Sequence, residues 1–202
     1  MDSRKFVFND YVVYVSVSLI EECIYSHRHE DLLSYVVFKS GILYACDPGR
    51  SSYSHREDMA SNKHNGLCMK NMAILPRFRF FYGKQLRRQI DISEERTPST
   101  LSLTACNRIS GISKTLNLFS DESGRLVIEE TISAKKSTEF SFRINLLKIE
   151  HWDNMSLECL SSEVEPKFES GFYSKEYGVH KEMVFAEIDL GSHLFCKTRL
   201  TL

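Results

Sequence analysis

The sequence predicts an α+β fold dominated by strands, with antiparallel sheets and a few short helices. Apolar and polar residues alternate over Phe140–Leu146 and again over residues 184–190 and 194–202, which is the period of half-buried strands. Thirteen Phe and nine Tyr against one Trp suit the faces of such sheets. With only nine Gly and four Pro in 202 residues, collagen-like and low-complexity chains are excluded.

The N-terminal region, residues 1–90, is expected to be strand-rich, with a polar loop at residues 50–66. A first strand is predicted over Phe6–Leu19 because Ser16 and Ser18 alternate with apolar neighbours there. Apolar elements follow at Leu32–Phe38 and Ile42–Cys46. These three segments predict the first part of an antiparallel sheet.

The C-terminal region, residues 99–202, is expected to combine a helix with an antiparallel sheet. Residues 84–98 are charged and end at Pro98, which makes them the best boundary between the two regions. Ser99 and Thr100 are typical N-cap residues. The following helix is predicted from an apolar spacing of i, i+4, i+8 and i+11, at Leu101, Ala105, Ile109 and Ile112.

Three short polar segments are predicted to be turns between strands. They are Lys39-Ser40-Gly41, Asp121-Glu122-Ser123-Gly124 and Gly191-Ser192. The last of these would close a C-terminal hairpin between Val184–Leu190 and Leu194–Leu202.

Charge and cysteine usage limit the functional classes. A formal net charge of −1 gives no global field that would attract nucleic acid or an anionic membrane. The six cysteines are dispersed without a Cys-x-x-Cys pair, which favours reduced thiols in a core. No run of about 18 apolar residues predicts a membrane span. The expected compartment is the nucleus or the cytoplasm.

Catalytic and metal-binding motifs give no positive signal. The sequence has no Gly-rich phosphate loop, no Gly-x-Ser-x-Gly and no His-Glu-x-x-His. His27-Arg28-His29 could place two imidazoles on one strand face, but a zinc site needs three or four ligands, and solvated loop residues are the simpler interpretation. We therefore expect a protein that is not an enzyme, with no cofactor, metal or small-molecule substrate.

Basic and aromatic residues are interleaved near the proposed boundary. Arg77, Arg79, Lys84, Arg87 and Arg88 fall among Phe78, Phe80, Phe81 and Tyr82. Cations combined with aromatic rings can bind nucleic acid through phosphate contacts and stacking. An amphipathic strand with a solvated charged face explains the same pattern, and both readings stay open.

Two segments resemble the sliding-clamp (PCNA-like) superfamily, and within it the subunits of the DNA-damage checkpoint clamp. Ile112–Leu118, followed by Gly124–Glu129, is similar to the hairpin that follows a helix in those proteins. Residues 183–196 are similar to their terminal hairpin. The resemblance covers mainly residues 99–132 and 183–202.

This resemblance implies two clamp-like half-domains and a ring subunit around duplex DNA in repair, recombination or checkpoint signalling. Its partners would be other protein subunits and, as an option, the DNA itself. Arg108 and Lys114, and with less support Arg87 and Arg88, would touch phosphates without reading bases.

Two other readings remain open beside the clamp. One is a β-rich protein-binding adaptor or viral accessory protein with no direct DNA role. The other is a small enzyme or metal protein, which would require His27 or His29 to converge with cysteine or acidic side chains.

Overall fold

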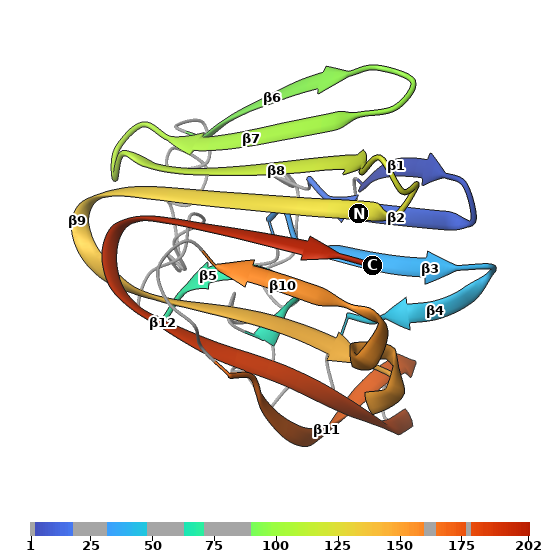
Figure 1. Ribbon diagram of the computed structural model, residues 1–202. Coiled ribbons are helices and arrows are strands. Elements are labelled where there is room, and N and C mark those ends of the chain that lie inside the picture. The colour runs from blue at the N-terminus through green and yellow to red at the C-terminus, as the bar shows by residue number, and fades with distance from the viewer. Residues whose placement is uncertain (1–2, 18–31, 48–62, 71–89, 160–164, 177–178) are drawn as a thin grey trace.

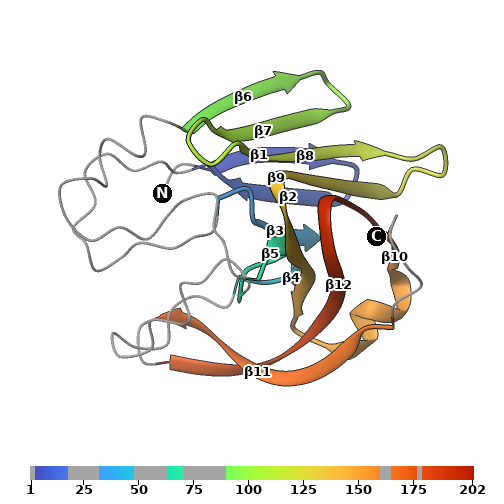
Figure 2. The ribbon, with the colours of Figure 1, turned by 90° about the vertical axis from the view of Figure 1, so that its left-hand side faces the viewer.

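The computed structural model describes residues 3–17, 32–47, 63–70, 90–159, 165–176 and 179–202, which form an antiparallel sheet that folds over on itself (Figures 1 and 2). The prediction of a strand-dominated, antiparallel protein is confirmed. The strands are β1 (Ser3–Phe8), β2 (Tyr11–Ser16), β3 (Tyr35–Lys39), β4 (Ile42–Ala45), β5 (Gly66–Met69), β6 (Ile90–Arg96), β7 (Leu101–Asn107), β8 (Ile112–Ser120), β9 (Leu126–Leu146), β10 (Ser156–Cys159), β11 (Lys167–Glu176) and β12 (Val179–Thr201), with a 3₁₀ helix, η3 (Ile149–Asn154), after β9.

Two long strands, β9 and β12, connect the two halves of the sheet. They pair antiparallel with each other along almost their whole length and bend together at one margin of the molecule (Figure 1). On one side of the bend, β9 also pairs with β8, and β12 pairs with β10. On the other side, β9 pairs with β4 and β5, and β12 pairs with β11.

The bend coincides with two interruptions of the β9–β12 register. One lies between Asp189 and Gly191, and the other between His193 and Phe195. Such irregularities increase local twist and let one strand pass from one layer of a sheet to another. The two halves therefore face each other although the hydrogen bonding is continuous.

The free edges of the two halves meet at β1 and β6. Arg4 forms an ion pair with Glu94, and the guanidinium of Arg96 donates a hydrogen bond to the carbonyl oxygen of Lys5. Charged side chains at an edge also hinder pairing with foreign strands.

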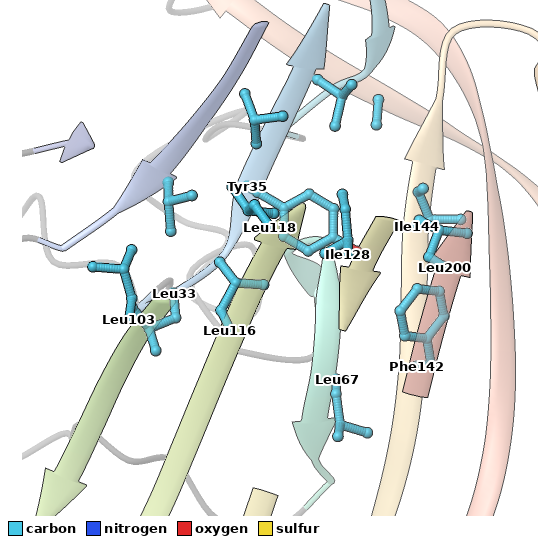
Figure 3. Close-up of a cluster of buried hydrophobic side chains, with 14 of the residues drawn as sticks. Leu33, Tyr35, Leu67, Leu103, Leu116, Leu118, Ile128, Phe142, Ile144 and Leu200 are labelled. Carbon is cyan, nitrogen blue, oxygen red and sulfur yellow. The ribbon is translucent and has the colours of Figure 1, made fainter. Parts of the chain in front are cut away.

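The main core lies between the two halves and draws on both. Leu33 and Tyr35 from one half lie close to Leu103, Leu116 and Leu118 from the other (Figure 3). All five are at most 1% exposed. Burial of each such aliphatic side chain contributes about 1.5–3 kcal/mol.

The predicted helix from Leu101 to Ile112 is wrong. Residues Leu101–Asn107 form β7, and Gly111, with φ of +67°, lies in the turn before β8. Leu101, Leu103 and Ala105 are buried while the residues between them are half-buried. This alternation with a period of two is that of a strand, and the i, i+4 spacing that suggested a helix is coincidental.

Two further expectations about strand ends are wrong. Phe6–Leu19 is not one strand, because Asn9, with φ of +48°, lies in a turn between β1 and β2. Gly191-Ser192 does not close a hairpin, because β12 continues through it as a bulged strand. The predicted turns at Ser40-Gly41 and Asp121–Gly124 are confirmed, with positive φ at Ser40, Gly41 and Gly124.

The half-domain arrangement implied by the clamp resemblance finds no support in the described residues. They contain no α-helix. Core residues from both expected regions, such as Val13 and Tyr35 on one side and Leu103 and Ile144 on the other, belong to a single hydrophobic cluster.

Candidate functional site

The strongest candidate site is a polar cluster where β4 ends and β5 begins. Asp47 follows β4, and His64 precedes β5. The Nδ1 atom of His64 lies 2.8 Å from Oδ2 of Asp47. The imidazole is 1% exposed and the carboxylate 31%, so the pair runs from the interior to the surface. A carboxylate on one nitrogen fixes the ring and the tautomer, as it does for histidines that move protons or bind metals.

Two asparagines hold this cluster in place. The side-chain amide of Asn65 donates to the carbonyl oxygens of Tyr35, at 2.7 Å, and Cys46, at 2.9 Å. Its oxygen accepts hydrogen bonds from the backbone and side-chain nitrogens of Asn145, at 2.7 and 3.0 Å. Asn145 also donates to the carbonyl oxygen of Lys63 at 3.1 Å. The start of β5 is thereby tied to β3, β4 and β9, and His64 is positioned between its anchored neighbours.

A buried guanidinium extends the cluster along β9. Arg143 is 4% exposed; its Nε donates to Oδ1 of Asn145 at 3.0 Å, and its Nη1 lies 3.3 Å from Oε2 of Glu187. It also lies over the ring of Phe185, 3.5 Å from the centroid. Burial lowers the pKa of Arg143, and the Glu187 carboxylate opposes that shift. The result is a cation held by stacking and hydrogen bonds.

A second polar group lies inside the main core. Nζ of Lys114 and Oε2 of Glu130 are 3.0 Å apart, and the backbone nitrogen of Leu67 donates to the same oxygen at 3.0 Å. Burial raises the pKa of Glu130, with Lys114 as the largest opposing influence. Burial, followed by the charge of Glu130, raises the pKa of Tyr35 well above its ordinary value.

The hydroxyl of Tyr35 influences Glu130 without forming a hydrogen bond of normal geometry. Within the described residues, neither that hydroxyl nor Oε1 of Glu130 has a hydrogen-bond partner. The Lys114–Glu130 group therefore lies enclosed between the two halves of the sheet, and we assign it to stability rather than to ligand contact.

Of the residues proposed to touch DNA, the two that the structure describes, Arg108 and Lys114, do not share a surface. Lys114 is on a strand and buried, contrary to its expected place beside a helix facing solvent. Arg108 lies in the β7–β8 turn and donates hydrogen bonds to the Asp91 carboxylate from Nε and from Nη2, the second to Oδ1 at 2.6 Å. Arg87 and Arg88, like the basic and aromatic residues 77–84, lie outside the described residues, as do His27 and His29.

His64 and Asp47 are suitable zinc ligands, but no group of three such side chains converges within the described ranges. Sequence reasoning missed His64, Asn65 and Asn145, because the first two lie at the end of a polar stretch and the third in an ordinary alternating strand.

None of the helices described is long and apolar enough to cross a membrane. The compartment, nucleus or cytoplasm, stays a prediction.

Comparison with known proteins gives structural neighbours only. Neither a scan against protein-family models nor a search of curated proteins finds a match. Among solved structures, the chain is similar to a heparinase III, the BT4657 gene product, with a TM-score of 0.67 and 14% identity over 98% of this chain. It is also similar to the heparan sulfate lyase HepC from Pedobacter heparinus, with a TM-score of 0.64 and 11% identity over 95% of this chain.

The chain spans about a third of the length of these proteins, 35% and 33% respectively. At such identities the likeness extends to the fold alone. It nevertheless corrects the sliding-clamp resemblance, and with it the expected role in DNA damage, DNA repair and the cell cycle, because the neighbours are polysaccharide lyases. The weak hairpin motifs that suggested a clamp occur in many antiparallel sheets.

Proposed function

We propose that this chain is a domain that binds an acidic polysaccharide, in the manner of an accessory part of a polysaccharide-degrading protein. The observation that carries the proposal is the near-complete match of the chain to about a third of heparinase III and of a heparan sulfate lyase. A fold alone does not define a function. The side chains of the candidate site must therefore supply the chemistry.

The cluster around Asp47 and His64 has the side chains that such a ligand requires. Acidic polysaccharides present hydroxyl groups and negative charges, which imidazole, guanidinium and amide groups can bind through hydrogen bonds. Asp47 is the partly exposed end of the cluster, whereas His64, Asn65 and Asn145 are buried. The hydroxyl groups of the ligand would thus approach Asp47, whose carboxylate can accept hydrogen bonds, with His64 and the asparagines as buried support.

The proposal keeps the expectation that the chain alone is not an enzyme. Cleavage of such polymers requires a base, an acid and a group that neutralises the sugar carboxylate. Within the described residues, one imidazole–carboxylate pair supplies only part of that set. Further groups would come from another domain or subunit, which agrees with the expected protein partners.

Surface plasmon resonance with immobilised heparan sulfate, and with uncharged dextran as the reference, tests this function. We expect saturable binding to heparan sulfate that weakens as salt rises, and none to dextran. Asp47→Asn should weaken binding, because a neutral amide replaces the carboxylate that accepts hydrogen bonds from sugar hydroxyl groups, while circular dichroism stays unchanged. Equal binding to both polymers, or to neither, would refute the proposal.

A test for unsaturated sugar products, by their ultraviolet absorbance, addresses catalysis separately. We expect no product from the chain alone. Steady product formation that Asp47→Asn abolishes would make the chain an enzyme in its own right.

A further inference from the structure

The bend between the two halves of the sheet carries a short segment of β9 that leaves the ladder. Ser133 pairs with Phe195 and Thr138 with His193, so residues 134–137 of β9 lie opposite Leu194 alone. Lys135, Lys136 and Ser137 are exposed in this segment. The segment lies at the margin of the molecule where β9 and β12 turn (Figure 1).

The two lysines differ from other exposed or half-buried cations on the described strands and turns. Arg108, Arg125 and Lys197 each have a carboxylate partner, at Asp91, Asp121 and Glu129. Within the described part of the chain, Lys135 and Lys136 form no ion pair. They are therefore available to an external anion without the loss of an existing contact.

The stem of Lys135 lies against the adjacent turn. Gly111 has a φ of +67°, and a Cβ atom there would lie 2.1 Å from Cε of Lys135. The lysine side chain therefore lies over the β7–β8 turn, at the surface of the bend.

Exposed apolar residues lie in the same bend. Leu194 and Phe195, in the stretch of β12 opposite residues 133–138 of β9, are 56% and 51% exposed, and Ile109 in the β7–β8 turn is 59% exposed. An exposed aromatic ring beside cations can pack against the C–H face of a sugar while the cations contact its acidic groups.

We propose that this bend is a second subsite for the acidic polysaccharide, separate from the Asp47–His64 cluster. Lys135 and Lys136 contact sulfate or carboxylate groups, and Phe195 packs against a sugar ring. This inference rests on the proposed function. A lipid surface fits less well, because electrostatic membrane binding generally uses clusters of about four to eight cations.

The test measures the affinity of the full chain for heparan sulfate at several salt concentrations. Lys135→Gln/Lys136→Gln should weaken binding about tenfold at low salt and reduce the salt dependence by about one to two released ions. The matched control is Lys148→Gln/Lys181→Gln, which removes the same charge from two exposed lysines outside the bend. The control should retain the affinity and salt dependence of the wild type.

A third variant separates the apolar contribution. Phe195→Ser should weaken binding about threefold without changing the salt dependence, because it removes a packing contact and no charge. Its effect should add to that of the lysine variant.

The possible outcomes distinguish the two proposals. If the wild type binds heparan sulfate and the Lys135/Lys136 variant binds equally well with the same salt dependence, the subsite is refuted and the proposed function stands. If the wild type does not bind, both fail. Binding to phosphatidylglycerol vesicles but not to heparan sulfate, with loss in the lysine variant, would replace the polysaccharide with a lipid surface.

Discussion

The two halves of β9 hold polar groups in opposite ways. Before the bend, Glu130 points into the main core and pairs with Lys114, and one carboxylate oxygen has no hydrogen-bond partner within the described residues. After the bend, Asn145 lies on the other face of the sheet, and its side-chain oxygen and nitrogen both form hydrogen bonds. The first group is an ion pair enclosed in the core, whereas the second is a network of paired amides that also holds the cation of Arg143.

The difference shows which group can lie close to a ligand site. A buried ion pair loses much of its attraction to the cost of removing both ions from water, and it tolerates the loss of neither partner. A satisfied amide network holds its backbone without adding net charge. The amide network therefore supports His64, while the ion pair stays enclosed by the two halves of the sheet.

Removal of the cation from the core should have the largest effect. Lys114→Met leaves Glu130 buried without its partner and should lower the free energy of unfolding by about 3–5 kcal/mol near pH 8. Burial raises the pKa of Glu130 in the folded protein. Its ionised form therefore opposes folding, and the loss should shrink as pH falls through the raised folded pKa toward the unfolded pKa of about 4, below which both states are protonated. Urea unfolding at both pH values measures this change.

The double variant Lys114→Met/Glu130→Gln is the control for this prediction. It removes both charges, so most of the stability at pH 8 should return. A double variant as unstable as Lys114→Met would show that packing of the lysine stem, rather than charge, decides the effect.

Disruption of the amide network should have the next largest effect. Asn65→Ala leaves two carbonyl oxygens and Asn145 without their partner, and should cost about 3 kcal/mol with little dependence on pH. Asn117→Ala, on a half-buried face of β8, should cost about 0.5 kcal/mol or less. Equal losses in thermal unfolding would contradict the structural role of Asn65.

A glycine between the two groups should give an intermediate effect. Gly66 has a φ of +117°, and a Cβ atom there would lie 2.5 Å from Oε2 of Glu130. Gly66→Ala should therefore cost about 2 kcal/mol through strain and displacement of the carboxylate.

Gly41→Ala separates these two causes. Gly41 also has positive φ, at +78°, but a Cβ atom there would meet nothing within 4 Å. Its substitution should cost about 1 kcal/mol from backbone strain alone. Equal losses at the two glycines would show that contact with Glu130 adds nothing.

The sequence allowed the local parts of this arrangement to be predicted, but not the distant ones. Alternation identified the strand at Phe140–Leu146, and glycine identified the turn at Ser40-Gly41, because both depend on neighbouring residues. The pairing of Asn65 with Asn145 depends on register between segments 80 residues apart, which composition does not encode. For the same reason, the sequence predicts a hairpin turn at Gly191, whereas β12 stays paired with β9 on both sides of this residue and continues through the bend.

A half-buried carboxylate on the turn before β9 should give the smallest effect and the opposite pH dependence. Hydrogen bonds from the Ser123 hydroxyl and then the Arg125 backbone lower the pKa of Asp121 to about 2. Its contribution to stability is present above the unfolded pKa of about 3.9 and is lost as pH falls through the folded pKa. An NMR titration of the carboxyl carbon should show this low pKa, and Ser123→Ala should raise it. Titration of wild-type Asp121 near 3.9 would contradict the proposed contacts. A low pKa at Asp121 beside a raised pKa at Glu130, both of which have a cation nearby, would show that enclosure between the halves, rather than proximity to a cation, decides the direction of the shift.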